Sequence, residues 1–242
     1  MSPRRTLIFL VSLGVVVAVG AVACARRETT TPHTPEHGHG HDGHTPAHHH
    51  RFDDAARWAQ QFEAPERDAW QQPDRVLARM SLQPEHRVAD IGAGTGYFAT
   101  RAARAVTRGR VWAVDIEPSM VRYLNERARR ENLDNLFSIL GSPSDPLLPE
   151  AVDVVLVVDT WHHIDGRVAY FANVRNSLRP GGRVVIVDFK RDSPEGPPVA
   201  MRVPPEEVRR DMEEAGYAQE GEVTDLPRQY VMVFRARQSQ AA

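Results

Sequence analysis

The clearest chemical signal in the chain is a glycine-rich turn that follows an apolar segment. Residues 88–97 read VADIGAGTGY, so Asp90 closes the apolar run and Gly92, Gly94 and Gly96 follow at alternate positions. Glycine permits positive φ angles and lets a ligand approach the backbone closely. A helix that begins just beyond the turn presents free N–H groups to that ligand. We therefore expect a nucleotide-type ligand here, outside the carboxyl end of the first strand of a sheet.

The spacing of the glycines separates two classes of nucleotide ligand. A dinucleotide fingerprint reads G-x-G-x-x-G, which would place its third glycine at position 97. This chain has the bulky Tyr97 there and its third glycine at Gly96. An NAD(P)-dependent oxidoreductase is therefore the disfavoured alternative, and the absence of a Tyr-x-x-x-Lys pair from the sequence also argues against it.

A second acidic residue lies where the next strand should end. Residues 110–115 read RVWAVD, and a carboxylate at Asp115 can accept hydrogen bonds from both ribose hydroxyls of a nucleotide. The alternative is that Asp115 caps the helix that Pro118 opens, a role that Glu117 and Ser119 can also fill. The glycine-rich turn upstream favours the ribose role.

These features, in this order, resemble class I (Rossmann-like) S-adenosylmethionine-dependent methyltransferases of the small-molecule type. The family's first motif is D-x-G-x-G-x-G, and residues 179–188, RPGGRVVIVD, resemble its turn into the fifth strand. The resemblance spans residues 52–235 and implies S-adenosylmethionine as the cofactor and a small molecule as the methyl acceptor. It does not identify that acceptor. The cofactor-binding residues that it implies are Asp90, Gly92, Gly94, Gly96, Tyr97, Asp115, Ile116 and Asp145.

The segment after the third strand departs from the family pattern. Many relatives carry an acidic residue there at once, whereas residues 141–146 read GSPSDP. Pro143 has no N–H to donate to an adenine ring, and Asp145 comes three residues late. Either Asp145 accepts a hydrogen bond from the exocyclic amine of adenine, or the segment is a plain turn.

Candidate catalytic residues follow the fourth strand, where the methyl group faces the acceptor in this family. Residues 159–163 read DTWHH. Methyl transfer is an in-line displacement, so the protein mainly positions the acceptor and excludes water. Histidine can act as a general base near neutral pH when the acceptor must lose a proton. We expect either His162 or His163 to be catalytic, with His162 preferred and Asp159 beside it, while the other histidine caps a helix or packs.

Aromatic residues provide candidates for the walls of the site. Trp161 and Tyr97 either face the sulfonium or the acceptor through cation–π contact, or simply pack. Trp70 and Gln71 are expected to lie on a lid, and Trp58 is expected to pack in the core.

Strand and helix patterns alternate along the part of the chain that must position these residues. Apolar runs such as residues 154–158, VVLVV, suit strands that helices bury on both faces. Three short N-terminal helices, which include the lid helices, come first: one capped by Asp53 or Asp54, one opened by Pro65, and one opened by Pro73. The alternation predicts a doubly wound, seven-stranded, mostly parallel α/β sheet. The expected strands are 87–91, 110–115, 136–140, 152–158, 183–189, 217–223 and 229–235, and the expected longer helices are 97–106, 118–130, 166–178 and 205–215.

The first 24 residues have the pattern of an export signal. Arg4 and Arg5 precede an apolar stretch, and residues 21–24, AVAC, resemble the lipobox of bacterial lipoproteins, whose cysteine is lipidated. We therefore expect a membrane-anchored and exported protein. The alternative is an uncleaved, cytosol-facing anchor, because the apolar stretch approaches the length needed to span a bilayer.

Residues 25–50 form a histidine-rich linker between this signal and a domain over residues 51–242. The segment has little apolar surface to bury and is expected to be a disordered tether. Imidazoles at this density bind Zn, Cu or Ni weakly, although a plain linker is the favoured interpretation. Eight of the 11 histidines lie here: His33, His37, His39, His41, His44, His48, His49 and His50.

Charge and cysteine content narrow the function further. With 30 basic and 32 acidic side chains, the chain offers no electrostatic footprint for nucleic acid. Cys24 is the single cysteine, so the domain has no disulfide and no thiolate metal site, and we expect no metal at the active site. A further alternative is a non-catalytic exported binding protein on the same fold that holds metal in its histidine tract. The export signal favours that alternative, because S-adenosylmethionine is made in the cytosol.

Overall fold

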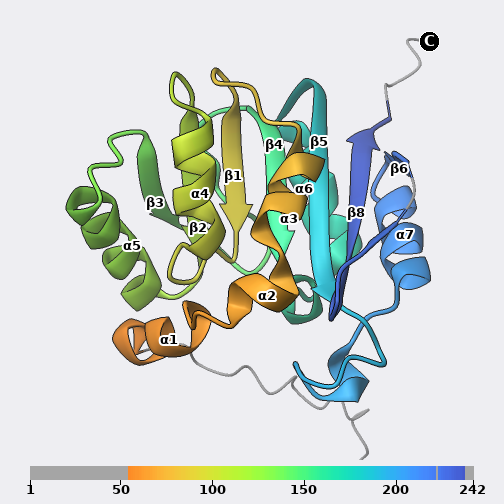
Figure 1. Ribbon diagram of the computed structural model, residues 1–242. Coiled ribbons are helices and arrows are strands. Elements are labelled where there is room, and N and C mark those ends of the chain that lie inside the picture. Colours follow the sequence, from red (N-terminus) through yellow and green to blue (C-terminus); the bar gives the residue numbers. More distant parts are fainter. Residues whose placement is uncertain (1–53, 222, 238–242) are drawn as a thin grey trace, which may run out of the picture. The chain divides into compact units, whose positions relative to one another are not determined.

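The computed structural model describes residues 54–221 and 223–237 of the chain (Figure 1). The expected signal with Cys24, the histidine-rich linker and residues 51–53 lie outside the described residues. The helices of the described segments all fall short of the length and apolar character that crossing a membrane requires.

A single sheet forms the centre of the domain, with strand order β3-β2-β1-β4-β5-β8-β6 and a short β7 paired with β8. Strands β1 to β5 pair in parallel, and β8 runs antiparallel to its neighbours. The expected doubly wound, mostly parallel sheet is confirmed, and the additional eighth strand is the two-residue β7. The strands are β1 (Arg87–Ile91), β2 (Arg110–Asp115), β3 (Leu136–Leu140), β4 (Val152–Val158), β5 (Leu178–Phe189), β6 (Tyr217–Gln219), β7 (Thr224–Asp225) and β8 (Gln229–Ala236).

Helices cover both faces of the sheet, as Figure 1 shows. Apolar residues of α3, α4 and α5 pack into one core cluster, and those of α6 and α7 pack into another on the opposite face. The central strand β4 contributes to both clusters, because Val154 and Leu156 belong to the first and Val155 and Val157 to the second. Successive side chains of a strand point to opposite faces, which explains why β4 is apolar throughout. The helices are α3 (Pro73–Met80), α4 (Tyr97–Ala105), α5 (Pro118–Arg130), α6 (Arg167–Asn176) and α7 (Pro205–Glu214).

The boundary between α6 and β5 differs most from the sequence-based expectation. Leu178 already pairs with Val152 in the sheet, so the helix ends earlier than predicted and the strand begins earlier. The register between β4 and β5 is irregular at this point, and Gly181 has a positive φ of 78°. The segment that was expected to be a turn is therefore an irregular start of the strand, of the kind produced by a β-bulge.

Two short helices, α1 (Ala55–Phe62) and α2 (Arg67–Gln71), lie across the edge where β1 and β5 end (Figure 1). Asp54 caps α1 by accepting the N–H of Arg57 at 3.1 Å. Pro65 lies in the turn before α2 and does not open it, in contrast to the expectation. These two helices form the expected lid. They face the point where β1 stands between β2 and β4, which is where ligands bind in open α/β sheets.

Candidate functional site

The glycine-rich turn links β1 to α4 with an unusual backbone. Gly92, Gly94 and Gly96 all have positive φ angles, of 73°, 55° and 93°. A Cβ atom at Gly92 would collide with the side chain of Thr160, which follows β4. The glycines are therefore required both by their backbone conformation and by the close approach of the two strand ends.

Asp115 joins this turn to the end of β2. Its carboxylate accepts the N–H of Gly94 at 2.9 Å and the N–H of Glu117 at 2.9 Å. Burial raises the pKa of this carboxyl, although both backbone hydrogen bonds oppose the shift. Ile116 beside it is 54 % exposed, which leaves an apolar surface next to a fixed carboxylate. This geometry is compatible with the cofactor-binding roles predicted for Asp115 and Ile116, which stay predictions.

Asp90 lies at the base of the turn and is only 3 % exposed. Burial raises its pKa to about 7, while the guanidinium of Arg67 on α2 lowers it. This carboxyl can therefore change its charge near neutral pH.

Arg67 is a site residue that the sequence reasoning did not identify. Its guanidinium donates to the carbonyl oxygen of Phe62 at 2.6 Å and also to Gln71. It lies 4.0 Å from the centre of the Tyr97 ring and 3.9 Å from the Asp159 carboxylate. Burial lowers the pKa of Arg67, against the attraction of Asp159. The spacing of Arg67 and Gln71, four residues apart on one helix face, is the signal that could have indicated a polar inner face of the lid.

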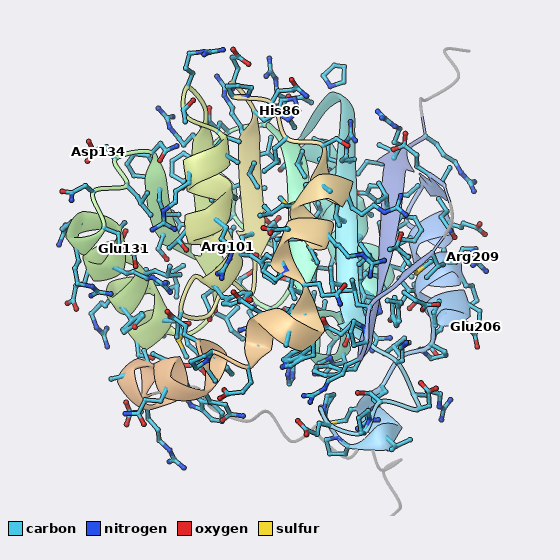
Figure 2. The ribbon with its side chains drawn as sticks, viewed as in Figure 1. His86, Arg101, Glu131, Asp134, Glu206 and Arg209 are labelled. Carbon is cyan, nitrogen blue, oxygen red and sulfur yellow. The ribbon has the colours of Figure 1, made fainter. Side chains whose placement is uncertain are left out.

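Tyr97 is covered and does not present an open aromatic face. The guanidinium groups of Arg67 and Arg101 lie 4.0 and 3.9 Å from its ring centre, and its hydroxyl donates to Asp68. Arg101, labelled in Figure 2, also pairs with Asp68 at 3.1 Å and so connects α4 to α2. Tyr97 therefore fixes the lid to the helix that follows the glycine-rich turn.

Asp159 has a positive φ of 53° directly after β4. Gln71 of the lid donates to it at 3.4 Å, and Gln229 of β8 donates to its other oxygen. Gln71 also donates to Gln229 at 2.9 Å, and both amides are fully buried. Burial, followed by the nearby Asp188 carboxylate, raises the pKa of Asp159 to about 7. Asp159 is thus the meeting point of the lid, the end of β4 and the start of β8.

His162 and His163 form a single turn of 3₁₀-helix, η1 (Trp161–His163), after β4. Their rings lie 4.2 Å apart. Nδ1 of His162 lies 3.0 and 3.1 Å from the two carboxylate oxygens of Asp188. Burial lowers the pKa of His162, but the Asp188 carboxylate outweighs burial and raises the pKa above its usual value. The structure therefore gives His162 a carboxylate partner that the sequence reasoning did not assign.

Two further sequence predictions have clear positions. Trp161 is fully buried and stacks on Phe171 at 4.7 Å, so it packs in the core and does not face the site. Asp145 accepts the N–H of Leu147 at 2.7 Å, and its own N–H donates to the hydroxyl of Ser142 at 3.0 Å. This geometry is that of a tight turn, and whether Asp145 also contacts an adenine stays a prediction.

The aromatic residues of the lid also have defined partners. Trp58 stacks on Phe62 within α1, with ring centres 5.4 Å apart, and is only partly buried, so it packs within the lid and not in the core as expected. Trp70 lies against Phe189, the last residue of β5, at 5.8 Å, and Arg228 stacks on its ring at 5.1 Å. Trp70 and Gln71 are thus lid residues, as expected. Among residues 54–221 and 223–237, no group of three or more metal-binding side chains is present.

Comparison with known proteins shows that part of this chain is similar to methyltransferases. Residues 89–186 match the model of a family described as a methyltransferase domain. A ubiquinone/menaquinone biosynthesis C-methyltransferase from Cupriavidus taiwanensis is 28% identical over 117 residues, which is 48% of either chain. The chain therefore spans about half the length of the curated relatives it matches.

Solved structures share the fold. A SAM dependent methyltransferase from Aquifex aeolicus matches 75% of this chain and 97% of its own length, with a TM-score of 0.69 and 22% identity. An O-methyltransferase from neocarzinostatin biosynthesis, solved with S-adenosyl-L-homocysteine and 1,4-dihydroxy-2-naphthoic acid, matches 76% of this chain with a TM-score of 0.62 and 16% identity. The fold is that of the Rossmann-like methyltransferases. Together with the family match, it supports S-adenosylmethionine as the cofactor.

Proposed function

We propose that this protein transfers a methyl group from S-adenosylmethionine to a small-molecule acceptor. One observation carries the proposal: the N–H of Gly94 donates to the Asp115 carboxylate at 2.9 Å. This hydrogen bond joins the glycine-rich turn to the carboxylate that is predicted to bind the ribose hydroxyls. Both residues lie within the segment that matches the methyltransferase family. They also lie at the carboxyl edge of the sheet, at its topological switch point.

The residues of this edge divide into two groups in the proposal. The glycine-rich turn, Asp90, Asp115 and Ile116 hold the cofactor, whose sulfonium supplies an activated methyl group. The end of β4, with Asp159, His162 and His163, holds the acceptor. The lid helices α1 and α2 position both molecules and exclude water, which is the main requirement for a displacement of this kind.

Binding and turnover test the proposal separately. Titration calorimetry of the full chain with S-adenosylmethionine, S-adenosylhomocysteine and NAD(H) should show binding of the first two compounds alone. Binding of NAD(H) without S-adenosylmethionine would show that the chain is not a methyltransferase. Binding of S-adenosylmethionine without methylation of any phenol, amine, thiol or carboxylate in a panel would favour the non-catalytic alternative.

We also propose that the domain is anchored to a membrane through lipidated Cys24 and exported. The support is the order of Arg4 and Arg5, an apolar stretch and small residues before the single cysteine. The histidine-rich linker would then act as a tether with weak affinity for divalent metals. Titration of the full chain with Ni²⁺, compared with a variant that lacks residues 33–50, tests that affinity. Equal binding by both proteins would contradict it.

A further inference from the structure

His162 and Asp188 form a buried pair beside the proposed acceptor site. The His162 side chain is 4% exposed and the Asp188 side chain 0%. Both carboxylate oxygens lie within 3.1 Å of Nδ1, and one of them also accepts the backbone N–H of Phe189 at 2.7 Å. These contacts fix the orientation of the Asp188 carboxylate relative to the His162 ring.

The strand order explains why two residues distant in sequence meet. Val158 of β4 pairs with Val187 of β5, and the N–H of Asp159 donates to the carbonyl oxygen of Val187 at 3.0 Å. The residues that follow these two strands consequently lie side by side at the carboxyl edge. The turn η1 then places the ring of His162 against Asp188.

The pair fixes which nitrogen of His162 can accept a proton. An ionised carboxylate only accepts hydrogen bonds, so Nδ1 is the nitrogen that carries a proton in neutral His162. The lone pair is then on Nε2. A base whose ring is oriented by a third group in this way is the usual arrangement for proton abstraction from a nucleophile.

We propose that Asp188 is a positioning residue that orients His162 as a general base, and that the methyl acceptor is a phenol. This inference rests on the proposed methyl transfer and names its acceptor class. The acceptor's O–H proton moves to Nε2 of His162. As the new oxygen–carbon bond forms, the carbon–sulfur bond breaks and its electron pair stays on sulfur.

Acidity favours a phenol over amines, carboxylates and alcohols. A neutral amine has an available lone pair and needs no base before attack, and a carboxylate acceptor would be repelled by Asp159 and Asp188. An alcohol resembles water, with a pKa of about 16, which is too far from that of an imidazole for efficient transfer. A phenol has a pKa of about 10, within reach of a histidine whose own pKa is raised.

The aromatic surroundings also fit an aromatic acceptor. Phe189 directly follows Asp188, and Trp70 of the lid lies 5.8 Å from it. Aromatic rings pack favourably in offset or edge-to-face arrangements at such separations. These two rings give the lid side of the carboxyl edge an aromatic surface against which a flat acceptor can pack.

The charged groups near His162 have opposing effects on its proton. Asp188 and Asp159 favour the imidazolium and Arg167 of α6 disfavours it. The base must be neutral to work, so turnover should rise with pH through a His162 pKa that lies above 6.5. The groups involved are Asp188 and Tyr230 from the paired strands β5 and β8, Asp159 after β4, Arg67 from α2, Arg167 from α6 and His163 beside His162.

A series of para-substituted phenols, from 4-methoxyphenol to 4-nitrophenol, tests the base with the full chain in mild detergent. His162→Gln should lower turnover of the least acidic phenol by about 10²–10⁴-fold. It should lower turnover of 4-nitrophenol, which is largely ionised at pH 8, by about tenfold at most. His86→Gln, at the opposite edge of the sheet (Figure 2), is the matched control and should behave like the wild type. A uniform loss across the series would mean that His162 has only a structural role.

Nitrogen-15 spectra of the histidine rings test the role of Asp188 without an acceptor. His162 signals, assigned by their absence in His162→Gln, should show the proton of the neutral ring on Nδ1. Asp188→Asn should lower the pKa of His162 and move the rising limb of the pH–kcat profile to lower pH, with KM nearly unchanged. A proton on Nε2, or an unaltered His162 pKa in Asp188→Asn, would overturn the dyad. If Asp188→Asn unfolds, the position of the proton on the wild-type His162 ring still tests the dyad.

The outcomes separate this inference from the proposed function. If S-adenosylmethionine does not bind, the proposed function itself fails. If it binds and the protein methylates thiols or amines in place of phenols, or methylates no phenol, the methyltransferase fold stands and the phenol assignment is wrong.

Discussion

Single carboxylates hold the backbone of the candidate site in place. Asp115 accepts two backbone N–H groups, Asp159 accepts two side-chain amides, and Asp188 accepts an N–H and pairs with a histidine. Hydrogen bonds to a charged group contribute about 1.5–3 kcal/mol each. The three residues thus give the edge of the sheet a fixed geometry, and each can be altered separately.

Asp115→Ala should weaken S-adenosylmethionine binding at least tenfold without unfolding the domain. The variant removes the carboxylate that would accept the ribose hydroxyls, a loss of about 1.5–3 kcal/mol per charged hydrogen bond. Titration calorimetry measures the affinity, and circular dichroism checks the fold. Asp134→Ala, at an exposed position after α5 (Figure 2), is the control and should bind as the wild type does. Unchanged affinity in Asp115→Ala would remove the ribose role.

Asp90 should make the protein less stable as pH rises through neutrality. Its pKa is about 7 in the folded state, because burial raises it above the ordinary value of 3.8. The folded state then binds the proton more tightly, so the stabilisation is complete below about pH 4 and is lost as pH approaches 7. Urea unfolding at pH 5 and pH 8 should show this loss, at most about 3 kcal/mol from this residue.

Asp90→Asn should reduce the difference in unfolding free energy between pH 5 and pH 8. The amide cannot ionise, so one group with a pKa of about 7 is removed, while Asp159, whose pKa is also about 7, remains. Asp134→Asn should leave the pH dependence as in the wild type. An Asp90→Asn protein with the full wild-type pH dependence would show that Asp90 ionises normally.

The local motif identified some site residues and left others unidentified. The glycines and Asp115 could be predicted because they belong to short motifs with a characteristic spacing. His162 could be predicted because it comes soon after a recognisable strand. Gln229 meets Gln71 across 158 positions, and nothing in local periodicity encodes that contact. Asp188 lies within the expected strand 183–189, but its role depends on β4 and β5 being neighbours, which only the sheet order reveals.

At the scale of elements, the lid is attached by polar contacts more than by apolar burial. Only Gln71 of α2 is buried, and the helix has just five residues. Its attachments are the Gln71 amide to Gln229 and Asp159, Arg67 to Asp159, and Asp68 to Tyr97 and Arg101. A short helix held in this way should open more readily than the sheet it covers.

Gln71→Leu should loosen the lid and spare the core. The change removes a donor that both Gln229 and Asp159 use, and leaving such buried groups unsatisfied costs about 1–3 kcal/mol. Hydrogen–deuterium exchange should become faster in residues 67–71 and remain slow in β4. Gln60→Leu, at an exposed position of α1, is the control. Equal exchange in Gln71→Leu and the wild type would show that the amide contacts do not hold the lid.

Strands with strong apolar patterns were predicted to the residue, whereas irregular elements were not. The bounds of β1 to β4 agree with the sequence-based expectation because each is a parallel strand whose apolar residues lie between polar segments. The start of β5 was missed, since residues 179–182 look like a turn and the bulge there depends on pairing with β4. The two-residue β7 has too few residues for any alternation to be visible.

For the whole molecule, the matched segment and the rest of the domain have different functions in the proposal. Residues 89–186 hold the cofactor residues and the histidines. The lid lies before that segment, and Asp188, Phe189 and Gln229 follow it. The lid and Asp188, which would position the acceptor and its base, thus fall outside the family match, whereas Asp159 and the two histidines lie inside it. This explains why fold and cofactor can be read from relatives while the acceptor must come from the geometry of this chain.

In the proposed function, the N-terminal segment would determine where the domain meets S-adenosylmethionine, which is made in the cytosol. We expect removal of residues 1–23 and lipidation of Cys24, because a basic start and an apolar stretch precede the cysteine. A doubly acylated cysteine anchors firmly, whereas one acyl chain binds membranes only marginally. In this proposal a flexible tether of about 25 residues would give the domain an r.m.s. reach of roughly 25–30 Å.

Intact mass and protease sensitivity in spheroplasts should both report this anchor. The mature mass should equal that of residues 24–242 plus the lipid, and added protease should degrade the domain in intact spheroplasts. Cys24→Ser should abolish the lipid mass and the processing, with no change in the fold. A full-length protein with unmodified Cys24 and a protected domain would contradict the lipoprotein proposal. It would favour an uncleaved anchor facing the cytosol, where S-adenosylmethionine is directly available to the site.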